Sequence, residues 1–340
     1  MAAAALMVMA GATAWGLTVH HQAPQSDLAD GRLPGALRSQ VLFFADRSRT
    51  AVVRADGTTI NDLAGVAASG YPFQPLDTGD HLAVFVHDNQ AYRVSAAGGP
   101  PQPVGAATSI FAADGGAVGL QGGGNGEPTS VEYMAADGTV PQPGTSSTQL
   151  PLGAVAVARL ADGLLVQANP TQSRPPRFEL IAPQSTLTLG SLTAVVGTHQ
   201  SWVAALTCPP HRAVAGCPLH LVDTAGRTDR VVRIPPGFTG FAEGGRFSPD
   251  GSLLAAFVDD TTPPNLGTMH LALIRTSTAT VTVVGPPLLV AGSAAWSTDS
   301  HWVFYGGLTG ALYAERTTPQ GPAGRSWKLP LSSSYAVTGL

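Results

Sequence analysis

The chain has 340 residues, of which 12% are charged and 44% are hydrophobic, and its formal net charge is −4. A net charge this small gives no basic surface that could bind a nucleic-acid backbone, which excludes nucleic-acid partners. It also gives little attraction to an anionic membrane surface. The 40 glycines and 28 prolines are typical of many short strands joined by turns, and the apolar content is large enough for a packed core.

The chain begins with an apolar segment, residues 1–19, that carries no charged side chain. It predicts an export signal or a short membrane anchor, and Ala12-Thr13-Ala14 matches an A-x-A cleavage site. The basic residues that usually open such a segment are missing, which indicates that the true start lies upstream of Met1. Cleavage and retention as an anchor both stay open, because about 20 apolar residues are needed to span a bilayer and basic residues upstream would lengthen the segment. Residues 20–38 are polar and predict a linker.

The rest of the chain, residues 39–340, repeats one pattern: an apolar strand, a small polar turn and a second apolar strand. The clearest copies are residues 247–257 and 296–305. Aligning the copies on the turn gives these equivalent positions: Gly79, Asp114, Asp162, His199, Asp250 and Asp299. Their spacing, from 35 to 51 residues, is typical of a β-propeller, whose blades are four-stranded antiparallel sheets. The fold class is therefore all-β.

The outer hairpins determine the number of blades. Seven of them alternate apolar and polar residues, and they begin near Ala51, Ala91, Ser130, Phe178, Pro218, Met269 and Ala311. Only six inner hairpins are complete, because the first blade has residues 41–44 but no strand before them. The C-terminal strand, residues 335–340, can supply the missing inner strand. We therefore predict a seven-bladed propeller closed by this pairing, which removes exposed sheet edges; six blades with frayed ends is the alternative.

The turn in residues 247–251, Phe-Ser-Pro-Asp-Gly, has a direct physical interpretation. Proline presets φ, the aspartate accepts hydrogen bonds from nearby backbone N–H groups, and glycine tolerates positive φ. Asp250 and Asp299 are therefore predicted to stabilise turns, with no catalytic role. The aromatic residues that open these turns, Phe247 and Trp296, are predicted core residues.

This turn, with its aromatic residue and the apolar strand that follows it, resembles the WD40-like repeats of the TolB family of extracytoplasmic propellers. It is also similar to the propellers that cap prolyl-oligopeptidase-type hydrolases. The resemblance is strong over residues 241–305 and weaker over 70–206. It implies an exported propeller. Two departures limit it: residues 1–40 leave no room for the N-terminal domain of TolB, and no G-x-S-x-G motif is present for a hydrolase domain.

Cys208 and Cys217 are the only cysteines, and they flank a loop between two apolar strands. An oxidising compartment allows them to form a disulfide across the neck of this loop. The alternative is a metal pair with His211 or His220, but structural zinc usually needs closer cysteine spacing and a second pair of ligands. We predict the disulfide. With 17 arginines against a single lysine, Lys328, the composition also indicates a high-GC bacterial gene.

No catalytic or metal-binding motif stands out in the sequence, and no cofactor is predicted. The nine histidines are scattered, without H-E-x-x-H or ligand spacing. A propeller can still assemble a site from distant blades in its central channel. The hypothesis is therefore a monomeric, non-enzymatic propeller, secreted or membrane-anchored through its N-terminal segment alone. It would bind an envelope protein, peptide or glycan, or act as a scaffold. An envelope enzyme, a glycan lyase or hydrolase with a site at the channel mouth, is the alternative.

The loops between the second and third strands of each blade emerge on one face. They are long in four consecutive blades, over Gln121–Thr129, Ala168–Pro176, Thr207–Gly216 and Asp259–Thr268. Long loops on one face often carry recognition, although neutral insertion is also tolerated at low cost. The candidate contact residues are polar side chains in these loops: Asn125, Glu127, Arg174, His211, Arg212, Asp259, Asp260 and Asn265.

Overall fold

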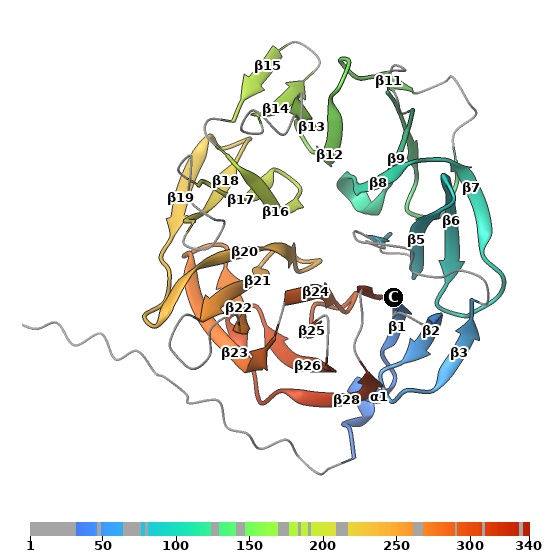
Figure 1. The fold of residues 1–340 in the computed structure, drawn as a ribbon, viewed down its shortest axis with the longest axis vertical. Helices are drawn as coiled ribbons and strands as arrows, with labels where there is room; N and C mark the ends of the chain where they lie inside the picture. The colour runs from blue at the N-terminus through green and yellow to red at the C-terminus, as the bar shows by residue number, and fades with distance from the viewer. Residues whose placement is uncertain are drawn as a thin grey trace, which may run out of the picture.

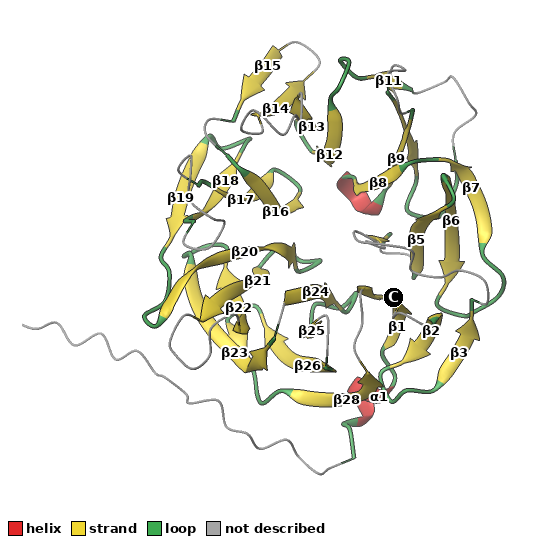
Figure 2. Ribbon diagram, in the orientation of Figure 1, coloured by secondary structure: helices red, strands yellow, loops and turns green. Residues whose placement is uncertain are grey.

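The structure is a computed structural model, and it describes most of the chain after residue 31. The described residues are 32–45, 49–63, 76–78, 81–123, 129–140, 147–168, 177–182, 185–189, 192–208, 217–260, 268–289, 291–307, 310–332 and 336–340. Seven antiparallel sheets stand in a ring around a central axis (Figure 1). The described helices are the short α1 (Gly35–Arg38) and the 3₁₀ turn η1 (Asp114–Gly116) (Figure 2). The predicted all-β, seven-bladed propeller is confirmed.

Each blade is one sheet, whose strands run in order from the innermost to the outermost. Blade 1 contains β29 (Ala336–Gly339), β1 (Val41–Ala45), β2 (Thr50–Arg54) and β3 (Thr59–Asp62); blade 2 contains β4 (Leu76–Asp77), β5 (Leu82–His87), β6 (Gln90–Ser95) and β7 (Gln102–Ala106). Blade 3 contains β8 (Ser109–Ala112), β9 (Val118–Gly122), β10 (Ser130–Met134) and β11 (Thr148–Gln149); blade 4 contains β12 (Val155–Leu160), β13 (Gly163–Ala168), β14 (Arg177–Ala182) and β15 (Ser185–Thr188).

The last three blades follow the same order. Blade 5 contains β16 (Ala194–His199), β17 (Trp202–Leu206), β18 (Leu219–Asp223) and β19 (Thr228–Val232); blade 6 contains β20 (Phe238–Phe247), β21 (Leu253–Asp260), β22 (Thr268–Arg275) and β23 (Thr280–Leu288). Blade 7 contains β24 (Ala291–Trp296), β25 (Trp302–Gly307), β26 (Ala311–Thr318) and β28 (Trp327–Ser332), with the short β27 (Gly321–Pro322) paired to the end of β26.

The two ends of the chain close the ring in blade 1. Strand β29 pairs antiparallel with β1, with Phe43 opposite Thr338, and the Leu340 N–H donates to the Val41 carbonyl at 2.9 Å. The predicted closure is confirmed, and it completes seven blades. Phe43 packs on Phe85 of blade 2, with ring centroids 5.3 Å apart, and Phe44 on the opposite face belongs to a core cluster shared with blade 7. Both aromatic residues therefore face a neighbouring blade.

The core lies between blades. The second strand of each blade is covered on both faces, so it needs apolar side chains on both faces instead of an alternating pattern. In β21, for example, every residue from Leu253 to Val258 is at most 2% exposed. Its alternate residues join two separate clusters: Leu254 packs toward blade 5 and Phe257 toward blade 7. Burial of each such large side chain contributes about 1.5–3 kcal/mol to the stability of the fold. This explains the unbroken apolar strand after each turn.

The polar turns have the predicted role. In blade 6 the Ser248 hydroxyl donates to Asp250 Oδ1 at 2.6 Å, and the Ser252 N–H donates to the same oxygen at 3.0 Å. In blade 7 Asp299 accepts from the Ser297 hydroxyl at 2.5 Å. Burial alone would raise the pKa of Asp250 and of Asp299, but these hydrogen bonds outweigh it and hold each pKa below its ordinary value.

The region before the propeller is described from residue 32 onward. The predicted linker over residues 20–38 includes α1, and Leu37 in this helix is fully buried in the cluster between blades 1 and 7. The end of this stretch therefore packs against the propeller core, although Leu37 is an isolated apolar residue with no repeat around it. The predicted signal or anchor, residues 1–19, lies outside the described residues, and no helix among the described residues is long and apolar enough to cross a membrane.

Candidate functional site

The two faces of the propeller carry different connections. On the loop face, defined by the connections between the second and third strands of each blade, the connections of blades 3 to 6 are long. In blade 2 the same connection is only the turn Asp88–Asn89. On the opposite turn face lie the turns that join the first strand to the second. Six of the candidate contact residues lie outside the described residues: Asn125, Glu127, Arg174, His211, Arg212 and Asn265. The roots of these loops, where the strands end, are among the described residues.

At the root of the blade 6 loop, Asp259 and Asp260 are the last two residues of β21 and pair with Met269 and Thr268. Asp260 is only 8% exposed, and its Oδ2 lies 3.7 Å from Nε2 of His270. The sequence pattern predicts an exposed loop tip at this position. The structure instead places Asp260 at a buried strand end, because β21 and β22 stay paired for their full length.

Burial at this root favours the neutral forms of two groups. Burial raises the pKa of Asp259, and the neighbouring Asp260 carboxylate raises it further. Burial lowers the pKa of His270, although the Asp260 carboxylate opposes this effect. The ring of Phe238 meets His270 edge-on, with centroids 5.5 Å apart. This packing holds the imidazole in place beneath the loop.

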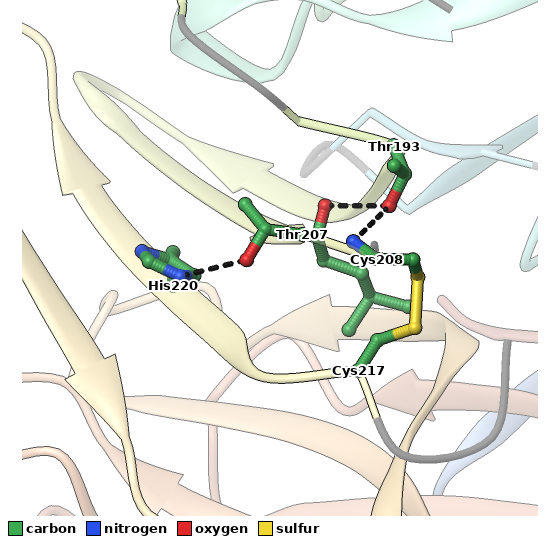
Figure 3. Close-up of a disulfide and its surroundings, with 6 residues drawn as sticks. Thr193, Thr207, Cys208, Cys217 and His220 are labelled. Carbon is green, nitrogen blue, oxygen red and sulfur yellow. Dashed lines mark hydrogen bonds between the residues drawn. A yellow bond between two sulfur atoms is a disulfide. The ribbon is translucent and has the colours of Figure 1, made fainter. Parts of the chain in front are cut away.

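At the root of the blade 5 loop, Cys208 and Cys217 form a disulfide with a Cα–Cα distance of 4.9 Å (Figure 3). This confirms the predicted pairing, and it excludes the metal alternative because both sulfur atoms are used. The Thr193 hydroxyl, from the connection that enters blade 5, accepts the Cys208 N–H at 3.0 Å and donates to the Leu206 carbonyl at 2.9 Å. The disulfide and Thr193 together brace the neck of the loop.

A second set of hydrogen bonds crosses three strands of blade 5 beside this neck. Nδ1 of His220 lies 2.9 Å from Asp229 Oδ1. On the other side of the ring, Nε2 lies 2.9 Å from the Thr207 hydroxyl (Figure 3). This order of carboxylate, imidazole and hydroxyl also occurs in nucleophilic catalysis. Acyl transfer would further need donors for an oxyanion. However, the Thr207 N–H donates to the Pro218 carbonyl, and the Cys208 N–H already has a partner. We therefore assign this relay a bracing role.

At the root of the blade 3 loop, Gln121 connects two blades. Its side chain is almost buried, at 6% exposed, and its Oε1 accepts the Ala156 N–H of blade 4 at 2.9 Å. The Thr108 hydroxyl donates to the Gln121 carbonyl at 3.1 Å from the connection that enters blade 3. The sequence pattern indicates neither this contact nor the Thr207–His220–Asp229 relay. The only sequence signal is a polar residue beside a strand end, and such residues are common.

The inner strands of blades 6, 7 and 1 are tied to one another near the central axis. The Arg246 guanidinium donates to the Thr338 hydroxyl at 3.0 Å, and Trp296 Nε1 donates to the Arg246 carbonyl at 2.9 Å. Within the described ranges, no group of three or more His, Cys, Asp or Glu side chains could hold a metal ion.

Comparison with known proteins identifies the fold. No protein-family model and no curated protein matches the chain. Among solved structures, TolB from Acinetobacter baumannii is similar, with 11% identity and a TM-score of 0.50 over 86% of this chain and 78% of that chain. The β-propeller domain of the trilobed protease from Pyrococcus furiosus has 10% identity and a TM-score of 0.56 over 83% and 86%.

A third similar structure, the acylaminoacyl peptidase from Pyrococcus horikoshii, has 11% identity and a TM-score of 0.56 over 83% of this chain but only 48% of that chain. At such identities the shared property is the fold. The chain is a seven-bladed β-propeller. The resemblance to TolB and to peptidase propellers is thus confirmed at the level of architecture, and these neighbours include both enzymes and TolB. The Pyrococcus furiosus domain has an open velcro topology, whereas β29 closes blade 1 in this chain.

Proposed function

We propose that this propeller is an exported binding or scaffolding module of the cell envelope, and that its partner binds the loop face over blades 3 to 6. The observation that carries the proposal is the bracing of the loop roots. Two of the four long loops begin at roots held by the Cys208–Cys217 disulfide, by Thr193 and by Gln121. Loops on rigid roots lose less conformational freedom when a partner binds, which improves affinity.

Exposed apolar side chains support a protein or peptide partner. Leu152, between β11 and β12, is 69% exposed, and Leu289, between β23 and β24, is 66% exposed. Both connections join an outermost strand to the next innermost strand, so they emerge on the loop face. Leu152 lies between blades 3 and 4, within the row of long loops, and Leu289 lies between blades 6 and 7, at the end of that row. Exposed apolar side chains of this kind add to the apolar centre of a protein interface, which a polar rim surrounds.

Two observations support an envelope location. The disulfide needs an oxidising compartment, and the apolar residues 1–19 are suited to export or anchoring. Charged groups on the loops, such as Arg212 on blade 5 and Asp259 on blade 6, would steer a polar partner. Their effect should appear mainly in the association rate and its salt dependence.

The proposal is tested by recovering crosslinked partners from envelope extract with the purified chain. A variant with Arg212→Ala and Leu289→Ser should lose them. The matched control is Val231→Ser, because Val231 is also exposed, at 56%, but lies within the outermost strand β19, opposite His220, and not in a connection between strands. Equal recovery with both variants would refute the location. Turnover of a glycan or peptide that one channel-facing substitution abolishes would instead favour the enzyme alternative.

A further inference from the structure

The inner turns of neighbouring blades touch one another on the turn face. The Ala161 N–H of blade 4 donates to the Gln200 carbonyl of blade 5 at 3.2 Å. In the same way, the Asp250 N–H of blade 6 donates to the Ser300 hydroxyl of blade 7 at 3.1 Å. In sequence register, Gln200 and Ser300 occupy the same turn position, and both have left-handed φ values of 51° and 60°. Each of these two turns therefore donates a backbone N–H to this position of the next turn.

Other contacts continue this ring of turns. A Cβ on Gly116 of blade 3 would collide with the Thr78 carbonyl of blade 2, and a Cβ on Gly251 of blade 6 would lie 2.6 Å from the His199 ring of blade 5. Glycine at these two positions lets adjacent turns pack directly on one another. The space next to each turn is thus shaped for another turn.

Blade 1 has no such turn. Its first strand, β29, and its second strand, β1, come from opposite ends of the described chain, so no short connection joins them. A cavity of about 530 Å³ lies at this place, within the size range of small-ligand sites. Its lining comes from blade 7, from blade 2 and from the two ends of blade 1: Ser39, Gln40, Val41, His81, Ser95, Ala96, Ala97, Thr298, Asp299 and Leu340.

The lining has the chemistry that holds turns elsewhere in the ring. Thr298 and Asp299 correspond in register to Ala161 and Asp250, whose N–H groups donate to the following turn. A ligand here should therefore present a carbonyl or hydroxyl oxygen to this backbone. Ser39 and Ser95 line the cavity beside the apolar Leu340, and their hydroxyl groups pair with the Ala36 carbonyl and the Ala97 N–H. A lining with polar residues next to an apolar one suits a compact turn, which exposes polar backbone groups, better than it suits a flat apolar surface.

We propose that this cavity, on the turn face, is a second binding site that accepts a reverse turn of Ser-Pro-Asp-Gly type presented by a partner protein. The partner turn completes the ring at blade 1, where no short connection joins the first two strands among the described residues. The site is separate from the loop face, so the two can be occupied independently.

The test uses a labelled cyclic peptide that contains Phe-Ser-Pro-Asp-Gly-Ser, the sequence of residues 247–252, and measures its binding to the full chain by fluorescence anisotropy. We expect saturable binding that is at least tenfold weaker for a ring of the same residues in scrambled order. Ala97→Trp should weaken binding at least tenfold, because this exposed residue lines the cavity. The matched control is Ala225→Trp in the corresponding outer turn of blade 5, which should bind like the wild type.

Hydrogen exchange on the wild-type complex keeps the test independent of any variant. Bound peptide should slow exchange at residues 95–97 and 298–300, with no change in the roots of the long loops. Absence of saturable binding, equal binding to Ala97→Trp, or protection confined to other blades would each overturn the proposal. The variant with Arg212→Ala and Leu289→Ser should still bind the peptide, so failure of the loop-face proposal is distinguishable from failure of this one.

Discussion

Glu315 carries the sharpest prediction because it is a carboxyl group inside the core of blade 7. It lies on β26 and is only 2% exposed. The Ser326 hydroxyl donates to its Oε2 at 2.5 Å, and the Tyr305 hydroxyl donates to Ser326 at 2.9 Å. Burial raises the pKa of Glu315 to about 7, although the hydrogen bond from Ser326 opposes the rise. We predict that Glu315→Gln stabilises the propeller at alkaline pH and not at acidic pH.

The magnitude follows from the difference between two pKa values. The ordinary value is 4.5 and the folded value is about 7, and each pKa unit corresponds to 1.36 kcal/mol. The folded state binds the proton more tightly than the unfolded state does. Stability is therefore lost as the pH rises from 4.5 through 7, by about 3 kcal/mol in total. Glutamine stays neutral and its oxygen still accepts from Ser326, so the variant avoids this loss.

The assay is urea unfolding of wild type and Glu315→Gln at pH 5 and pH 8. We expect the variant to gain at most about 1 kcal/mol in free energy of unfolding at pH 5, half a unit above the ordinary pKa, and about 3 kcal/mol at pH 8. The measurement at pH 5 serves as the control, because it reports any packing change that the amide causes by itself. A gain of the same size at both pH values, or no gain at pH 8, would refute the reasoning.

Two further predictions concern the closure and the loop neck. Gly339→Ala should lower the free energy of unfolding by about 1–3 kcal/mol, because a Cβ there would collide with the Trp296 backbone carbonyl; Gly35→Ala, where no atom lies within 4 Å, is the control, and similar urea midpoints for both would contradict this. Replacing Cys208 and Cys217 by serine should cost about 2–3 kcal/mol while the propeller stays folded by circular dichroism. If alkylation and peptide mapping of exported protein find free thiols at both positions, the disulfide does not form and this second prediction is wrong.

The sequence alone predicts the features that depend on local pattern. A turn such as Ser248 to Gly251 specifies its own hydrogen bonds within a few residues, and the apolar run after it is readable because a strand between two blades needs apolar residues on both faces. Counting hairpins then leaves one inner strand missing and one terminal strand unassigned. The closure by residues 336–339 follows from this arithmetic, and the disulfide between Cys208 and Cys217 follows from their place at either end of one loop.

Only the tertiary structure reveals the features that depend on contacts between strands and blades. Glu315 reads as an exposed strand residue, but Ser326 and Tyr305 enclose it. Asp260 reads as a loop tip, but a paired strand end buries it. The cavity at blade 1 has no sequence signal at all, because it arises where a turn is absent between segments from three blades. A repeat pattern describes each blade separately, whereas burial, hydrogen bonds and cavities at the seams depend on how the closed ring brings distant residues together.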